Sequence, residues 1–198
     1  MNLPTKFTVT RIVMTFIIIF ILLFPFYTVG ITFPRFTVDG ILIKSEYIVA
    51  GILFILASVT DSIDGKLARK NNMVTDLGKM LDAIADKILV DSVLIILSYQ
   101  GFISVLVPVI IVLRDIFVDA IKMQAASKGK VVAAIKTGKI KTACLMIGTV
   151  LAFFYNLPFE LAGLDVADFM LLIGCVMSIV SGIEYFHQNK DLLSTETI

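Results

Sequence analysis

Four aspartates in an otherwise apolar chain are spaced so that they could hold metal ions against a phosphate ester. Asp61 and Asp64 are three residues apart and Asp82 and Asp86 are four apart, so each pair lies on one face of a helix. A turn centred between residues 73 and 74 would bring the two helices together. Asp64 is then level with Asp82, and Asp61 is level with Asp86. With a rise of 1.5 Å per residue, the two layers lie about 5 Å apart.

Carboxylates this close cannot all ionise without compensation. Shared protons, basic partners or divalent cations could provide it, but the nearby basic residues, Arg69 and Lys87, are too few to neutralise four acids. All-oxygen ligands suit Mg²⁺ or Mn²⁺, and two such ions about 3.5–4 Å apart would clamp the attacking and leaving oxygens of a phosphoryl transfer. Small residues beside the acids, Gly65, Ala68 and Gly78, would leave room for a nucleotide. Two other interpretations are an ion pathway for the acids and helix packing for the small residues.

The composition predicts that these residues lie in a membrane protein. The chain has 198 residues, of which 58% are hydrophobic, whereas soluble domains contain about 45–50% apolar residues. No linker divides it, so residues 1–198 are expected to form a single integral membrane catalytic domain. The net charge of +1 gives no bulk attraction to nucleic acid.

The apolar runs predict an all-α fold with six transmembrane helices, since a spanning helix needs about 20 apolar residues. Their expected ranges are Thr8–Val29, Glu46–Arg69, Gly78–Tyr99, Ile103–Ala125, Gly138–Tyr155 and Val166–Phe186. Lysine and arginine are concentrated after the second and fourth of these segments. Both termini and the aspartates are therefore expected to face the cytoplasm.

The motif Asp-x2-Asp-Gly-x2-Ala-Arg-x8-Gly-x3-Asp-x3-Asp, from Asp61 to Asp86, resembles that of the CDP-alcohol phosphotransferase family. The resemblance implies that family's fold, six membrane helices in a homodimer. It also implies transfer of a phosphatidyl group from CDP-diacylglycerol to an alcohol, with release of CMP. A divalent cation, Mg²⁺ or Mn²⁺, would be bound, with two ions per site.

The resemblance also implies a role for each motif position. The metal ligands would be Asp61, Asp64, Asp82 and Asp86. Asp86 would in addition be the general base that accepts the proton of the attacking hydroxyl. The nucleotide-binding residues would be Asp61, Gly65, Ala68, Arg69 and Gly78.

Outside the motif, the chain resembles the bacterial phosphatidylglycerophosphate synthases. The segments "MNLPTKFTVTR", "GKIKTACLMIG" and "SGIEYF" carry this resemblance, which implies sn-glycerol 3-phosphate as acceptor and the bacterial plasma membrane as location. The acceptor's phosphate would be bound by Arg114, Lys139, Lys141 and Thr142. An ion pair of Arg114 with Asp115 or Asp119 is the alternative interpretation of that arginine.

The chain departs from the pattern of these synthases at three positions. Ala83 replaces a common proline, Asp119 lies where a small or hydroxyl residue is usual, and Lys122 lies where an arginine is usual. An added acid should weaken an anion pocket, unless Asp119 and Lys122 pair with each other at this i,i+3 spacing. These departures leave open another acceptor for the same reaction, such as inositol phosphate, serine or a lipid. An alternative from a different class of protein is an ion-coupled transporter.

Overall fold

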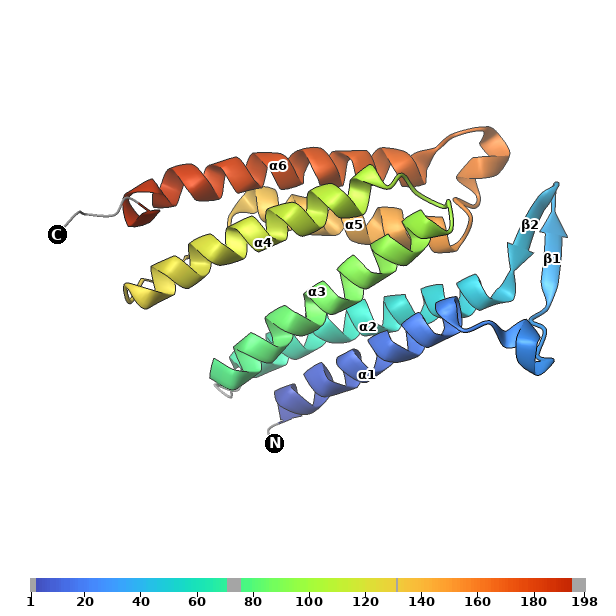
Figure 1. Cartoon of the computed structure of the whole chain (residues 1–198), viewed down its shortest axis with the longest axis horizontal. Helices are drawn as coiled ribbons and strands as arrows, with labels where there is room; N and C mark the ends of the chain where they lie inside the picture. Colours follow the sequence, from blue (N-terminus) through green and yellow to red (C-terminus); the bar gives the residue numbers. More distant parts are fainter. Residues whose placement is uncertain (1–2, 71–75, 131, 194–198) are drawn as a thin grey trace.

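Six long helices make up most of the computed structural model, which describes residues 3–70, 76–130 and 132–193 (Figure 1). Side chains of residues 3–6, 61–70, 76, 77, 79 and 191–193 are outside that description. The helices are α1 (Leu3–Leu23), α2 (Ser45–Lys70), α3 (Asp76–Tyr99), α4 (Leu106–Ser127), α5 (Lys136–Phe153) and α6 (Val166–Leu193). Two short 3-10 helices, η1 (Phe26–Val29) and η2 (Phe159–Ala162), lie in the connections.

The predicted ends of two helices were wrong by more than three residues. α1 runs from Leu3 to Leu23 rather than from Thr8 to Val29. It ends before Pro25, because proline has no backbone N–H and disfavours helical geometry at the residue before it. α6 begins at Val166 as predicted, but it continues to Leu193, past the predicted end at Phe186.

The predicted all-α class holds for the six long helices, but the connection between the first two contains a strand pair that was not predicted. Strands β1 (Arg35–Val38) and β2 (Ile41–Lys44) form an antiparallel hairpin there. Its turn residues, Asp39 and Gly40, have φ values of 45° and 86°. Positive φ at both central positions is typical of the two-residue turns that match strand twist, and Asp-Gly is a preferred pair for them.

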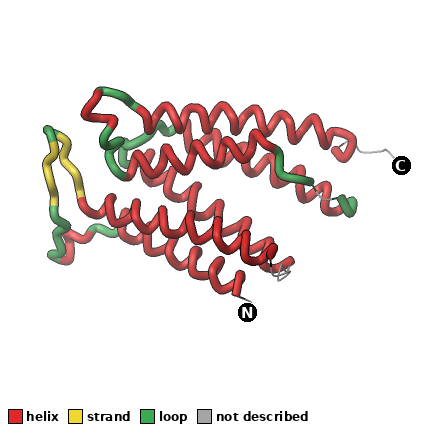
Figure 2. Tube along the Cα trace, turned by 180° about the vertical axis from the view of Figure 1, so that it is seen from behind, coloured by secondary structure: helices red, strands yellow, loops and turns green. Residues whose placement is uncertain are grey.

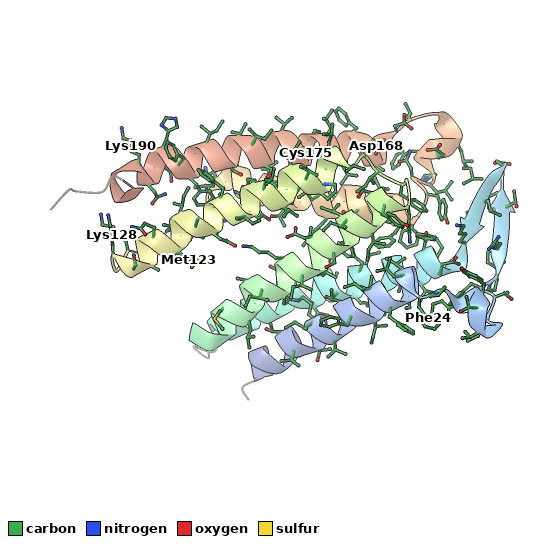
Figure 3. The ribbon with its side chains drawn as sticks, in the orientation of Figure 1. Phe24, Met123, Lys128, Asp168, Cys175 and Lys190 are labelled. Atoms are coloured by element: carbon green, nitrogen blue, oxygen red, sulfur yellow. The ribbon has the colours of Figure 1, made fainter. Side chains whose placement is uncertain are left out.

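The helices form two groups, α1–α2–α3 and α4–α5–α6, as Figures 1 and 2 show. Within the groups, α1 packs on α2 and α3, and α6 packs on α4 and α5. The groups meet through α3 with α4 and through α2 and α3 with α5. α1 begins and α6 ends at the same end of the molecule, where Lys128 and Lys190 also lie (Figure 3). The hairpin, Phe24 and Asp168 lie at the opposite end.

Two glycines allow α5 and α6 to approach closely. A Cβ atom on Gly148 of α5 would lie 2.7 Å from Leu171 Cγ, and one on Gly174 of α6 would lie 2.7 Å from Leu145 Cδ2. Each glycine thus receives a leucine from the other helix, and both leucines are almost fully buried. This reciprocal packing fixes the position of α5, which carries Lys141.

One helix of the described residues is long and apolar enough to cross a membrane by length and composition. This is Val166–Lys190, with a mean hydropathy of 2.2. Phe7–Leu23 and Ser45–Thr60 are shorter apolar helices. Charged residues lower the hydropathy of α3 and α4, and some of them pair between these helices, as Lys87 does with Asp119.

Candidate active site

The predicted metal and nucleotide residues lie on two consecutive helices. Five of them fall in the last turns of α2, and their side chains are outside the described residues: Asp61, Asp64, Gly65, Ala68 and Arg69. Gly78, Asp82 and Asp86 lie in the first half of α3. The predicted level arrangement of the four aspartates across the turn therefore stays a prediction. Asp82 and Asp86 can be described in detail.

Asp82 and Asp86 converge on one cationic atom supplied by α1. Arg11 Nη1 donates to Asp86 Oδ1 at 2.7 Å and to Asp82 Oδ1 at 3.1 Å. The Arg11 side chain is fully buried, whereas each of the two aspartate side chains is 46% exposed. The guanidinium therefore contacts the carboxylates from the protein interior, and both carboxylates remain accessible from the other side.

Arg11 lies on the stripe of α1 that is turned into the protein. The buried members of this stripe recur every three or four residues: Thr8, Arg11, Thr15, Ile18 and Leu22. This spacing places them on one helical face. The stripe is polar in the first half of α1 and apolar in the second half. Thr15 Oγ1 donates to the Arg11 carbonyl at 2.9 Å, so this hydroxyl is satisfied within the helix.

The donor chemistry at this point fits a hard divalent cation. Two aspartate oxygens are directed at one positive centre, and both side chains are about half exposed. Carboxylate oxygens are the ligands that Mg²⁺ and Mn²⁺ prefer. Among the side chains that the structure describes, no group of three or more His, Cys, Asp or Glu could hold a metal ion. A complete set of four ligands would require Asp61 and Asp64.

A second charged cluster is centred on Asp115 of α4. Asp115 Oδ1 accepts from Lys141 Nζ at 2.6 Å and from Arg114 Nη1 at 2.8 Å. Arg114 Nη2 donates to Ser181 Oγ of α6 at 2.7 Å, and its guanidinium carbon lies 5.5 Å from the Tyr185 ring centre. Two cations therefore share one carboxylate in a largely buried position between α4, α5 and α6, and the ion pair considered for Arg114 is present.

The face of α3 that carries Lys87 and Asp91 is turned toward this second cluster. Lys87 forms an ion pair with Asp119 of α4. Asp91 interacts electrostatically with Asp115 and Lys141. Asp91 Oδ1 is buried and has no hydrogen-bond partner among the described residues. Asp91 is therefore a buried carboxylate of α3 that interacts electrostatically with the Asp115–Lys141 pair.

Asp119 and Lys122, the two unusual residues of α4, have different partners. Asp119 pairs with Lys87, while Lys122 Nζ lies 5.5 Å from the centre of the Tyr185 ring. The same ring is approached by Arg114. The added acid at Asp119 is therefore matched by a lysine of the preceding helix.

The four predicted phosphate-binding residues do not lie together. Arg114 and Lys141 meet at Asp115. Lys139 and Thr142 are exposed residues on another face of α5, and Thr142 Oγ1 donates to the Gly138 carbonyl at 3.1 Å. The difference follows from helix geometry, because successive residues are rotated by about 100°.

Sequence reasoning missed Arg11 and Asp91 as candidates. Both carried a signal, namely a charged residue inside a predicted membrane helix, which is costly unless it has a partner or a function. Arg11 is the last residue of the segment "MNLPTKFTVTR", which carries part of the resemblance but assigns no role to this arginine. Its contact with Asp86 spans 75 positions of the chain, and only the packing of α1 on α3 reveals it.

Comparison with known proteins gives consistent results across the length of the chain. The family model described as CDP-alcohol phosphatidyltransferase matches residues 1–180. A Bacillus subtilis protein named CDP-diacylglycerol–glycerol-3-phosphate 3-phosphatidyltransferase is 40% identical over 194 residues, covering 98% of each chain. Proteins of the same name from Haemophilus influenzae and Rickettsia typhi are also similar. The first is 32% identical over 97% of this chain and 95% of its own. The second is 30% identical over 96% of this chain and 97% of its own.

These matches cover both helices of the aspartate motif, the arginine of α1 that contacts it, and the charged cluster of α4 and α5. The chain therefore belongs to the CDP-alcohol phosphatidyltransferase family.

Proposed function

We propose that the protein transfers the phosphatidyl group of CDP-diacylglycerol to sn-glycerol 3-phosphate, giving phosphatidylglycerophosphate and CMP. The observation that carries this proposal is the similarity, over nearly the full length of both chains, to relatives that bear the name of that reaction. The four-aspartate motif is complete in the sequence, which supports an active enzyme rather than a silent relative.

Asp86 acts as general base in this proposal. Its carboxylate takes the proton of the acceptor hydroxyl as the hydroxyl oxygen attacks the phosphorus of the phosphatidyl group and the bond to CMP breaks. The half-exposed position of Asp86 leaves it accessible to a substrate hydroxyl. Arg11 holds the carboxylate from the buried side, so Asp86 does not have to reorient when substrate arrives.

The residues that would hold the divalent cations, Mg²⁺ or Mn²⁺, are Asp61, Asp64, Asp82 and Asp86. When bound, the cations would neutralise the diphosphate and stabilise the charge on departing CMP. Gly65, Ala68, Arg69 and Gly78, with Asp61, would line the nucleotide site. The absence of large side chains at the two glycines and the alanine would let the backbone of α2 and α3 approach the cytidine.

Arg114 and Lys141 are the cations that this proposal assigns to the acceptor's phosphate. Their shared contact with Asp115 supports the assignment, because it holds both cations in place before an anion binds. Lys139 and Thr142 would serve at the exposed face of α5, as a second contact for an anionic group. An acceptor without a phosphate would make no use of these cations.

The proposed location is the bacterial plasma membrane, with six helices spanning it and with both termini and the active site facing the cytoplasm. Lys128 and Lys190 lie at the end where α1 begins, which supports this orientation (Figure 3). Several charges that lower the hydropathy of α3, α4 and α5 are paired between helices, including Lys87 with Asp119 and Lys141 with Asp115. A homodimer is part of the same proposal.

The experiment that tests the function measures CMP release by the purified protein in detergent. The protein receives CDP-diacylglycerol, Mg²⁺ or Mn²⁺, and separately sn-glycerol 3-phosphate, glycerol, serine or inositol phosphate. The expected result is release with sn-glycerol 3-phosphate alone, abolished by a chelator and restored by either ion. Release with another acceptor only, or no release from folded protein with any acceptor, would contradict the proposal.

A further inference from the structure

Arg11 is placed to act on the reaction although it lies outside the aspartate motif. It comes from α1, a helix that contributes none of the motif residues, and its side chain is fully buried. A buried cation is costly unless it is paired and hydrogen-bonded. One nitrogen, Nη1, donates to oxygens of both Asp82 and Asp86. The side chain is therefore held where it restrains two carboxylates together.

Asp82 and Asp86 need this restraint more than buried aspartates would. They are four residues apart on α3, and nearly half of each side chain is exposed. An exposed aspartate samples several rotamers, and loss of that freedom costs free energy whenever a ligand requires one orientation. Ala85, between them, is fully buried and fixes the backbone of α3 at this level. The backbone is thus set by packing, and the carboxylate orientation is set by Arg11.

We infer that Arg11 is a positioning residue of the active site, which holds the carboxylates of Asp82 and Asp86 from the buried side in the orientation that the transfer reaction requires. This inference rests on the proposed function, in which both aspartates take part. It concerns an arrangement of the folded chain itself, in which Arg11 contacts both carboxylates. α1 thereby becomes part of the catalytic apparatus rather than only a membrane anchor.

A positioning role and a purely structural role predict different kinetics. Loss of a structural contact lowers stability but leaves the folded fraction active. Loss of a positioning contact lowers kcat in the folded fraction, because a misplacement of about 1 Å can cost about 100-fold in rate. KM for sn-glycerol 3-phosphate should change little, since Arg11 contacts neither Arg114 nor Lys141 in the structure.

The test compares Arg11→Met and Arg11→Lys with a matched control, Thr15→Val. Thr15 is the next residue of the same buried stripe, and among the described residues its hydroxyl bonds only to the Arg11 carbonyl. Arg11→Met should lower kcat about 100-fold and leave KM for sn-glycerol 3-phosphate within about twofold. Arg11→Lys should recover part of kcat, because lysine keeps the positive charge and N–H donors but has a shorter side chain without the guanidinium fork. Thr15→Val should retain the wild-type kcat.

A second readout needs no turnover. In chelator-treated protein, Arg11→Met should lower Tm. The decrease should be at least halved in an Asp82→Asn/Asp86→Asn background, where the ion pairs of Arg11 with these two aspartates are already lost. An equal decrease in Tm in both backgrounds would overturn the inference, as would a wild-type kcat in folded Arg11→Met. If Arg11→Met does not fold, Arg11→Lys decides by the same two criteria. Failure of the wild-type protein to release CMP would reject the proposed function, while the Tm comparison would still decide whether Arg11 holds the two carboxylates.

Discussion

Lys141 donates a hydrogen bond to Asp115 at 2.6 Å, and this contact joins α5 to α4 inside the charged cluster. Arg114 donates to the same oxygen at 2.8 Å. Asp115 is therefore the common counter-charge of two cations in a largely buried position. The stability of α4 against α5 should depend on this carboxylate.

Asp115→Asn should lower the free energy of unfolding by about 3 kcal/mol, because removal of one partner leaves buried charge uncompensated. Thermal unfolding in detergent measures the change. Asp165→Asn is the matched control, since Asp165 is exposed at the far end of the molecule. An Asp115→Asn protein as stable as the control would show that the two cations are compensated elsewhere.

Asp119→Ser should strengthen binding of an anionic acceptor. Asp119 now neutralises Lys87, and both side chains are partly exposed. Exposed pairs contribute about 0.2–1 kcal/mol, so release of the lysine charge should lower KM for sn-glycerol 3-phosphate roughly threefold. Steady-state CMP release at varied acceptor concentration gives this value. The same substitution should leave KM for CDP-diacylglycerol unchanged, and equal shifts for both substrates would contradict the assignment of this region to the acceptor.

Gly148→Val should destabilise the packing of α5 on α6. A Cβ atom at this position would lie 2.7 Å from Leu171 Cγ and 3.1 Å from the Ala167 carbonyl oxygen. The backbone oxygen cannot move aside easily, so the added side chain should cost about 2 kcal/mol. Tm in detergent measures it against Ala143→Val, which places the same β-branched side chain on the exposed face of α5. Equal Tm values for the two variants would mean that α5 and α6 are farther apart in solution.

Much of the fold could be predicted from the sequence, because helix periodicity and turn residues are local signals. The range of α2 was predicted within one residue at each end, and α6 was predicted to begin at Val166, where it does. The hairpin was missed although Asp39-Gly40, a recognised turn pair, lies between two short segments that contain β-branched and aromatic residues. Each strand has only four residues, so neither forms a long apolar run.

The site could be predicted only where its residues are neighbours in sequence. Helical spacing placed Asp82 and Asp86 on one face of α3, and both contact the same nitrogen. That nitrogen belongs to Arg11 of α1. In the second cluster, Lys141 of α5 and Arg114 of α4 share the carboxylate of Asp115. Such contacts depend on how α1 packs on α3 and how α4 meets α5. A single sequence contains no local pattern for that packing.

Asp86→Asn should abolish most turnover and preserve the fold. The amide has nearly the shape of the carboxylate but cannot accept the proton of the attacking hydroxyl, and general-base catalysis contributes about 10²–10⁴-fold. We therefore expect CMP release to fall by about a thousandfold. Arg11 keeps Asp82 as a partner at 3.1 Å, so α1 should stay packed on α3. Single-turnover CMP release measures the chemical step, and Tm measures the fold.

The control for this variant is Asp168→Asn, a substitution of an exposed aspartate at the opposite end of the molecule (Figure 3). It should retain wild-type turnover. If Asp86→Asn also turned over at the wild-type rate, another group would have to take the hydroxyl proton. A loss of turnover together with a large fall in Tm would instead assign the effect to the broken contact between Arg11 and Asp86. Loss of turnover in a protein with nearly wild-type Tm is the result that a catalytic carboxylate at position 86 requires, because the fold is then intact and the charge that would accept the proton and help to hold the metal has been removed.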